Sequence, residues 1–212
     1  MRRPSCRASA PCWPLCAAGH WTKPPASPAP TCGRRCPVWK RCSLAVADPL
    51  LSGLAPVVAL DTRLLVLGSF PSVASLAAQQ YYGHARNQFW PLLAALWQQP
   101  LADWPYPLRL DFVRAQGLGI WDVYARCRRP GSLDADISDA EVNDLAGLVA
   151  TLPQLRLVAH NGGESARAMR ITAALGVAVL RLPSTSPANA SWSFERKLAA
   201  WRKAFEQAGL LR

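Results

Sequence analysis

Apolar runs of strand length recur along the chain from about residue 60 onward. The first, TRLLVLG at 62–68, is closed by a glycine, and such a run is typical of a buried strand in a parallel sheet. Three later segments predict strands in the same way: GIWDVY at 119–124, the first part of LRLVAHNGG at 155–163 and the first part of VAVLRLPS at 177–184.

Segments with helical spacing of their apolar residues separate these runs. Helices are predicted at 88–99 and 106–117, and the amphipathic segment at 194–209 predicts a closing helix that ends at a glycine. The alternation of strands and helices predicts an α/β fold: a three-layer sandwich around a central, mostly parallel sheet of four strands.

Two further helices complete the predicted order of elements. Ser138 and Glu141 have the spacing of a capping box, which predicts a helix from there to about Thr151. Another helix is expected after the HNGG turn at 160–163, and it should run through Leu175.

The first 47 residues differ in composition from the rest of the chain. They hold six of the seven cysteines and many prolines, and they lack apolar periodicity. We therefore expect 1–47 to be a disordered or extraneous basic tail, and 48–212 to form a single α/β domain. The arginine-rich, acid-free composition also permits a transit peptide, although prolines disfavour the amphipathic helix that one needs.

The cysteines of this segment leave one alternative open. Cys12 and Cys16, then Cys32 and Cys36, form two CxxxC pairs that could hold zinc or an iron–sulfur cluster. The common spacing is CxxC, and two more cysteines disturb the count. We expect no metal and no cofactor.

The charge of the chain is unevenly distributed. The formal net charge is +11, but residues 1–42 carry eight Lys and Arg and no acid, so the remainder carries only +3. Bulk charge is therefore weak evidence that the folded part binds nucleic acid.

No apolar run is long enough for a signal-peptide core or a membrane span, which favours a cytoplasmic protein.

Polar, irregular loops follow each predicted strand. They read GSFPS at 68–72, WDVYARCRR at 121–129, HNGG at 160–163 and PSTSPANAS at 183–191. Ligands of open parallel sheets bind beyond the carboxyl ends of the strands, so these loops should form the site. The aromatic stretch YYGHARNQFW at 81–90 opens onto the same edge.

The residue types at this edge exclude several kinds of chemistry. The chain has neither a GxxxxGK[ST] nor a GxGxxG phosphate loop, and it has no GxSxG or HExxH motif. Ser69 could act as an esterase nucleophile, with only His84 or His160 available as a base. Amide, hydroxyl and aromatic groups dominate, and they suit a site that grips a flat heterocycle and cleaves its glycosidic bond through an oxocarbenium-like transition state.

Residues 62–209 resemble the uracil-DNA glycosylase superfamily, most closely its hypoxanthine-DNA (deoxyinosine) glycosylase branch. The resemblance rests on LGSFPS, YYGHARNQFW, GIWDVYARCRRPGSLD, HNGG and PSTSPANA, which occur in the family's order. It implies a monofunctional DNA-repair enzyme that flips a deaminated base (hypoxanthine, with uracil and xanthine as further candidates) out of DNA and hydrolyses its N-glycosidic bond, leaving an abasic site.

The resemblance also implies roles for individual residues. Members of the superfamily place an Asp or Asn before the proline of the first motif, where this chain has Ser69. In the branch that this chain resembles, the asparagine of HxRNxFW acts instead, which indicates Asn87 as the catalytic residue. Asn87 precedes a predicted helix and could also simply be its N-cap.

The residues that we expect to bind the base are Ser69, Phe70, Pro71, Tyr82, His84, Asp122 and Asn161. Among them, Phe70 and Tyr82 are expected to stack on the base, and Asp122 to accept from N1–H of hypoxanthine.

Contacts with DNA are expected from two loops. The residues are Arg126, Arg128 and Arg129 after the second strand, and Ser184, Thr185, Ser186 and Asn189 after the fourth. No Leu or Phe wedge is present in the second loop. The expected partner is double-stranded DNA, with single-stranded DNA left open, and the expected state is a monomer in the cytoplasm associated with the nucleoid. Two alternatives stay open: an inactive DNA-binding module of the same fold, and a serine esterase.

Overall fold

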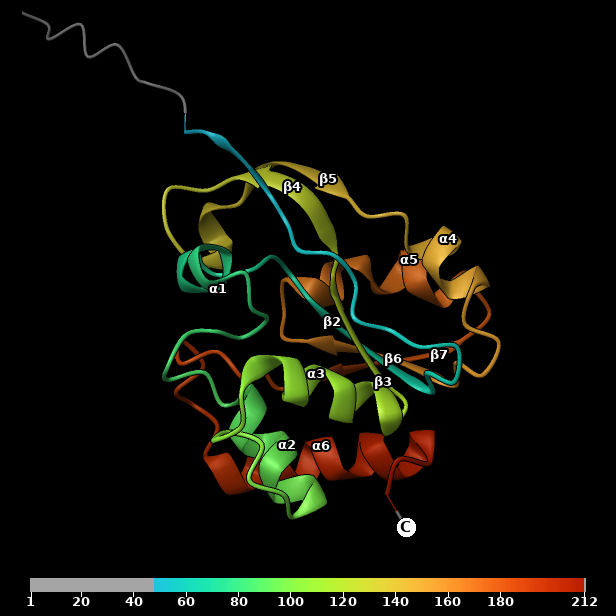
Figure 1. The fold of residues 1–212 in the computed structure, drawn as a ribbon. Helices are drawn as coiled ribbons and strands as arrows, with labels where there is room; N and C mark the ends of the chain where they lie inside the picture. The colour runs from blue at the N-terminus through green and yellow to red at the C-terminus, as the bar shows by residue number, and fades with distance from the viewer. Residues whose placement is uncertain (1–47, 212) are drawn as a thin grey trace, which may run out of the picture. The chain divides into compact units, whose positions relative to one another are not determined.

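A parallel sheet of four strands forms the centre of the computed structural model, which describes residues 48–211 (Figure 1). The strand order is β3-β2-β6-β7, with β2 paired to β3 and β6 along its length. The predicted parallel sheet is therefore confirmed. The tail expected at 1–47, with its cysteine pairs, lies outside the described residues. The strands are β2 (Leu64–Gly68), β3 (Leu118–Asp122), β6 (Leu157–Asn161) and β7 (Ala178–Leu182).

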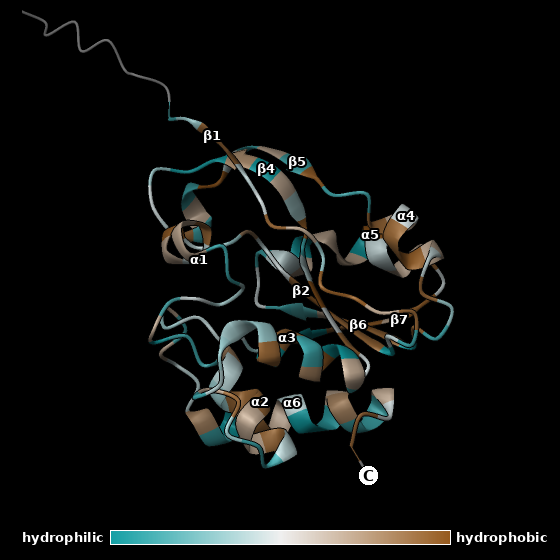
Figure 2. Ribbon diagram, viewed as in Figure 1, coloured by the Kyte–Doolittle hydropathy of each residue, from teal (hydrophilic) through white to brown (hydrophobic). Residues whose placement is uncertain are grey.

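Helices cover both faces of this sheet and complete the three layers (Figure 1). Figure 2 shows apolar residues concentrated along the strands β2, β6 and β7, between the helical layers. One layer contains α2 (Phe89–Trp97), α3 (Tyr106–Ala115) and α6 (Phe194–Ala208). The opposite face carries α4 (Leu145–Ala150), the 3-10 helix η2 (Ser165–Ala168) and α5 (Met169–Ala173), and the short helix α1 (Val73–Ala78) follows β2.

The α2 and α6 layer packs through large aromatic side chains. Phe89, Trp201 and Phe205 are completely buried, and the ring of Phe89 meets Trp201 edge-on with centroids 5.8 Å apart. Helix α6 begins at Ser193, whose side chain accepts from the backbone N–H of Arg196, and ends at Gly209 in the left-handed conformation (φ +75°). The predicted closing helix therefore forms as expected.

A second, antiparallel sheet was not expected from the sequence. Its order is β1-β4-β5, and the strands are β1 (Leu50–Ser52), β4 (Tyr124–Arg128) and β5 (Ser138–Val142), with the 3-10 helix η1 (Asp134–Asp136) between the last two. The strand predicted at 119–124 divides at Val123, where the chain leaves the parallel sheet and enters β4.

The helix predicted from Ser138 is wrong. Ser138 and Glu141 lie in β5, which is exposed throughout and is held by its pairing with β4. Long-range strand pairing prevails here over a local capping pattern. The helix begins instead at Leu145, where the side chain of Asp144 accepts from the backbone N–H of Gly147. Over the range 48–211, no helix combines the length and apolar character that crossing a membrane requires.

A candidate active site at the carboxyl ends of the strands

A cavity of about 790 Å³ lies at the carboxyl ends of the four parallel strands. The loops after β2, β6 and β7 form its wall, together with Asp122 at the end of β3, residues 132–134 after β4 and part of the stretch 81–87 that precedes α2. The structure therefore brings together most of the predicted site residues: Ser69, Phe70, Pro71, Tyr82, Asn87, Asp122, Asn161, Ser184, Thr185, Ser186 and Asn189.

Asp122, the last residue of β3, is the most unusual group of this cavity. Its side chain is buried, and Oδ2 has no hydrogen-bond partner among the described residues. The pKa of Asp122 is raised to about 7: burial is the largest cause, the negative charge of Asp134 acts in the same direction, and the positive charge of Arg129 opposes both. A buried carboxyl oxygen without a partner can form a hydrogen bond with a ligand that enters the cavity.

Gly68 leaves the space that Asp122 occupies. A Cβ atom at position 68 would lie 2.2 Å from Oδ1 of Asp122 and 3.6 Å from the hydroxyl of Tyr82. Gly68 pairs with Asp122 in the register of β2 and β3, so the two residues meet at the sheet edge. The glycine that closes the first strand is therefore needed for the carboxyl group to reach the cavity.

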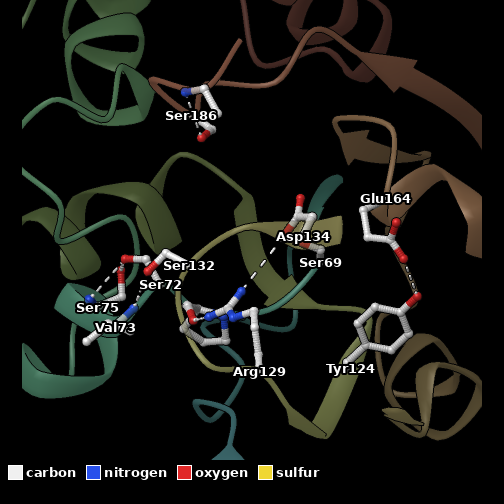
Figure 3. A network of polar contacts seen from close by, with 12 residues as sticks. Ser69, Ser72, Val73, Ser75, Tyr124, Arg129, Ser132, Asp134, Glu164 and Ser186 are labelled. Atoms are coloured by element: carbon white, nitrogen blue, oxygen red, sulfur yellow. Dashed lines mark hydrogen bonds and ion pairs between the residues drawn. The ribbon is translucent and has the colours of Figure 1, made fainter. Parts of the chain in front are cut away.

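A second carboxylate, Asp134 in η1, was missed by the sequence interpretation. Its Oδ1 accepts a 2.7 Å hydrogen bond from the hydroxyl of Ser69 and lies 3.9 Å from Nη1 of Arg129 (Figure 3). The neighbouring Ser132 accepts from the backbone N–H of Val73, so the chain after β4 is bonded to the chain after β2. Asp134 is the last residue of GIWDVYARCRRPGSLD, one of the motifs on which the family resemblance rests. Its position in that motif could have identified it as a site residue.

Arg129 is not available to bind DNA, and this prediction is wrong. Its side chain is 1% exposed, donates to the carbonyl of Pro71 and lies over the ring of Phe70, 5.2 Å from the centroid. It therefore holds the first motif in place and offsets the charge of two carboxylates, Asp122 and Asp134. The guanidinium packs inward because only there does it meet acceptors, carboxylates and an aromatic face together.

Two other predicted arginines lie on the small sheet. Arg126 forms an exposed ion pair with Glu141 at 3.8 Å, and Arg128 forms one with Asp139 at 3.2 Å. Neither contributes to the wall of the cavity, and each is partly neutralised by its partner. His84 also lies outside the cavity wall, with Nδ1 accepting from the backbone N–H of Arg86.

Tyr82 provides an aromatic part of the wall. Its ring stacks on Phe89 with centroids 3.8 Å apart and a 21° angle between the planes. Asn161 donates to its hydroxyl (3.2 Å) and to Oγ1 of Thr185 (2.9 Å), and accepts from the backbone N–H of Thr185. Burial raises the pKa of Tyr82 well above its usual range, so the hydroxyl stays protonated. These contacts of Asn161 position Tyr82 and the loop after β7.

Asn87 lines the cavity just before α2 begins. Its Oδ1 accepts a 2.9 Å hydrogen bond from the backbone N–H of Phe89, so the side chain caps the first N–H of the helix from the position just before the N-cap residue, Gln88. Phe89 and Trp90 are buried, as expected for the residues that anchor the helix behind the cavity. An amide held at a cavity wall can also orient a water molecule through its free hydrogen-bonding positions.

Lys197 is a second residue that the sequence interpretation missed. This buried lysine of α6 donates to Oε1 of Gln88 (2.7 Å) and to the carbonyl of Asn189 (3.1 Å). Burial lowers its pKa. Gln88 in turn donates its backbone N–H to the carbonyl of Thr185 (3.0 Å). The two loops that carry Asn87 and the predicted DNA contacts are thus tied together through α6.

The geometry does not support a serine hydrolase. The hydroxyl of Ser69 donates to Asp134, whereas His160 is buried and bonded to Ser165 and Thr172 on its two ring nitrogens. His84 does not line the cavity. No serine–histidine pair is therefore formed at Ser69. Residues 48–211 contain no group of three or more side chains suited to hold a metal ion.

Comparisons with known proteins agree with the fold. Residues 55–207 match the model of the Uracil DNA glycosylase superfamily. Two proteins named hypoxanthine DNA glycosylase are each 36% identical to this chain. The match with the protein from Methanosarcina acetivorans extends over 153 residues, which make up 72% of this chain and 96% of the relative. The match with the protein from Methanosarcina barkeri extends over 155 residues, which make up 73% of this chain and 98% of the relative. The solution NMR structure of a candidate uracil DNA glycosylase from M. acetivorans superposes with a TM-score of 0.69 at 34% identity, covering 76% of this chain and 99% of that one.

Proposed function

The chain belongs to the uracil DNA glycosylase superfamily, and from this membership we propose that it hydrolyses the N-glycosidic bond of hypoxanthine in DNA and leaves an abasic site. As a DNA N-glycosylase it acts on DNA, and the choice of hypoxanthine comes from the two relatives of that name. Their similarity extends over almost their whole length. We also propose that it acts on chromosomal DNA, since this is the DNA that a repair glycosylase must reach.

The observation that carries the proposal is the buried carboxyl group of Asp122, which lines a cavity with aromatic walls and has one oxygen without a hydrogen-bond partner among the described residues. Hypoxanthine carries a hydrogen on N1, and the ionised carboxylate of Asp122 accepts from it. Adenine has a lone pair at N1, which an ionised carboxylate repels. The same group therefore selects the deaminated base and rejects the normal one. Uracil and xanthine also carry ring N–H groups, so they stay in the substrate range to be tested.

The size and walls of the cavity suit an extruded base. A volume of about 790 Å³ lies within the usual range of ligand pockets, roughly 300–1,000 Å³. Extrusion of a base from the duplex costs a few kcal/mol, and mispaired bases cost least. Tyr82, supported from behind by Phe89, and Phe70, supported by Arg129, provide rings that offset this cost by stacking, at about 1–3 kcal/mol per contact.

Cleavage requires little proton transfer from the protein. The sugar develops oxocarbenium character as the bond breaks, and a water molecule adds to it. Asn87 is proposed to orient this water through its amide, in a monofunctional reaction that forms no covalent intermediate. The nearby carboxylates of Asp122 and Asp134 add negative potential that stabilises the positively charged sugar.

The test is a panel of labelled duplexes that each contain one hypoxanthine, uracil or xanthine, or adenine as the control. The duplexes are incubated with the protein and treated with alkali to reveal abasic sites. Strand cleavage at hypoxanthine and none at adenine is the expected result. Binding without release of any base would instead indicate the inactive DNA-binding module.

A further inference from the structure

A second groove of about 460 Å³ runs along the outside of the domain between β7 and α6. Strand β7 is the edge of the parallel sheet, and the groove lies between this strand and α6. The groove begins where the cavity ends, because Arg181 and Trp192 line both. Its apolar floor is formed by residues such as Leu180 and Ala204.

All the charged side chains that line this groove are basic. They are Arg181 on β7 and Arg196 and Lys203 on α6. None of the three forms an ion pair with any residue of the described range, in contrast to Arg126 and Arg128 on the small sheet. Beside the cavity, the positive charge that forms no ion pair within the described range therefore lies next to β7, and not on the small sheet, where the sequence predicted DNA-binding arginines.

Arg181 stands at the junction of the cavity and the groove. Its Nη2 would lie 3.2 Å from a Cβ atom at position 163, so the guanidinium rests against the backbone of the Gly162-Gly163 turn. The glycine leaves room for the guanidinium at the rim of the cavity. A phosphate that entered the cavity mouth would meet this group first.

Trp192 and Arg196 form a flat surface at the same place. The guanidinium of Arg196 lies over the indole, 4.5 Å from the ring centroid, and Trp192 remains 36% exposed. An exposed tryptophan with a cation on its face is a stacking platform for a nucleobase, and stacking is tolerant of sequence because every base has a flat face.

Two of the three cations lie on the same side of α6, since both line the groove. Arg196 and Lys203 are seven residues apart, which is two helical turns and about 10 Å along the axis. Two cations this far apart can reach separate phosphates of one DNA strand.

We propose that this groove holds the DNA strand next to the extruded nucleotide. Phosphates lie between Arg181, Arg196 and Lys203, and Trp192 stacks against a flanking base. The inference rests on the proposed function for the identity of its ligand. It adds a path for the strand that no residue predicted from the sequence provides.

The test measures equilibrium binding to a duplex with a stable abasic-site analogue, at several salt concentrations. Each lost phosphate contact lowers the slope of log K against log salt by about 1, so R196Q/K203Q should lower it by about 2. R202Q is the matched control, because Arg202 is exposed on the same helix and does not line the groove. W192A should weaken binding about 10-fold, with thermal melting used to confirm that each variant is folded.

Three outcomes decide the inference. A lower slope in the double variant with an unchanged slope in R202Q supports it. An unchanged slope in the double variant, or an equal loss in R202Q, overturns it, since the cations would then act only through the general field of α6. Because binding to the analogue requires no base release, a protein that binds through the groove but releases no base would overturn the proposed function alone.

Discussion

Nζ of Lys197 donates a 2.7 Å hydrogen bond to Oε1 of Gln88, the residue that follows Asn87. The lysine is 1% exposed, so the bond is protected from water. The same ammonium group donates to the carbonyl of Asn189 in the loop after β7. A single buried cation thus sets the distance between the start of α2 and the loop that faces DNA, although it does not line the cavity itself.

Lys197→Met should therefore reduce base release more than stability. The methionine fills similar volume, but it leaves the two acceptors without their donor at a cost of about 1–3 kcal/mol, offset in part because no ammonium group is buried. We expect the single-turnover rate to fall at least 10-fold with a small change in melting temperature.

A double-mutant cycle with Gln88→Ala separates this role from a general packing defect. If the bond to Gln88 transmits the effect, the double variant should release base no more slowly than Lys197→Met alone. Additive losses would show that the lysine acts through other contacts.

The sequence predicted the parallel sheet because its strands are buried, and burial leaves an apolar run that is visible locally. Convergence of the loop residues followed from the topology of parallel strands. The role of Lys197 could have been predicted from its position in the helix. Positions 197, 201, 204, 205 and 208 share the buried face of α6. A lysine on that face must find acceptors.

The strands of the small sheet have no comparable pattern in the sequence. All five residues of β5 are exposed, and β1 is only three residues long, so neither has an apolar run or an alternating pattern. β1 pairs with β4 across more than 70 residues of chain. The burial of Arg129 was hidden for the same reason, because its acceptor on Pro71 is 58 residues away.

Gly68→Ala tests the placement of Asp122. The added Cβ would meet Oδ1 at 2.2 Å, which forces the carboxyl group away from its position. We expect a loss of about 1–3 kcal/mol in the free energy of unfolding and a strong loss of hypoxanthine release. Gly131→Ala is the control, since nothing lies within 4 Å of the added atom there. Full activity of Gly68→Ala would remove Asp122 from base recognition.

The rate of hypoxanthine release should depend on pH through Asp122. Burial raises its pKa to about 7, so the carboxylate that accepts from N1–H is fully present above that pH and is lost below it. The single-turnover rate at saturating protein should therefore fall about 10-fold per pH unit below 7 and level off above it. A rate that rises toward acid would mean that the protonated carboxyl donates to the base instead.

Asp122→Asn should stabilise the fold at neutral and alkaline pH. The folded-state pKa of about 7 exceeds the ordinary value of 3.8, so ionisation opposes folding progressively between about pH 4 and 7 and by roughly 4 kcal/mol above that range. The neutral amide removes this cost. Melting temperatures of the two proteins should nearly coincide at pH 4 and diverge as the pH rises, with the variant more stable and unable to release hypoxanthine. Equal melting temperatures at pH 8 would show that ionisation of the buried Asp122 does not lower the free energy of unfolding.

Asn87 requires two substitutions, because it combines a structural and a proposed chemical role. Its Oδ1 caps α2 through the backbone N–H of Phe89, and its amide lines the cavity. Asn87→Ala removes both the cap and the amide, whereas Asn87→Ser retains a capping oxygen and removes only the amide.

If Asn87 orients the attacking water, both variants should release hypoxanthine about 10²–10³-fold more slowly in a single turnover, as expected for the loss of one positioned group. Only the alanine variant should lose about 1 kcal/mol of stability. Normal release by Asn87→Ser, with a slow and less stable alanine variant, would reduce Asn87 to a helix cap and leave the position of the water to another residue of the cavity.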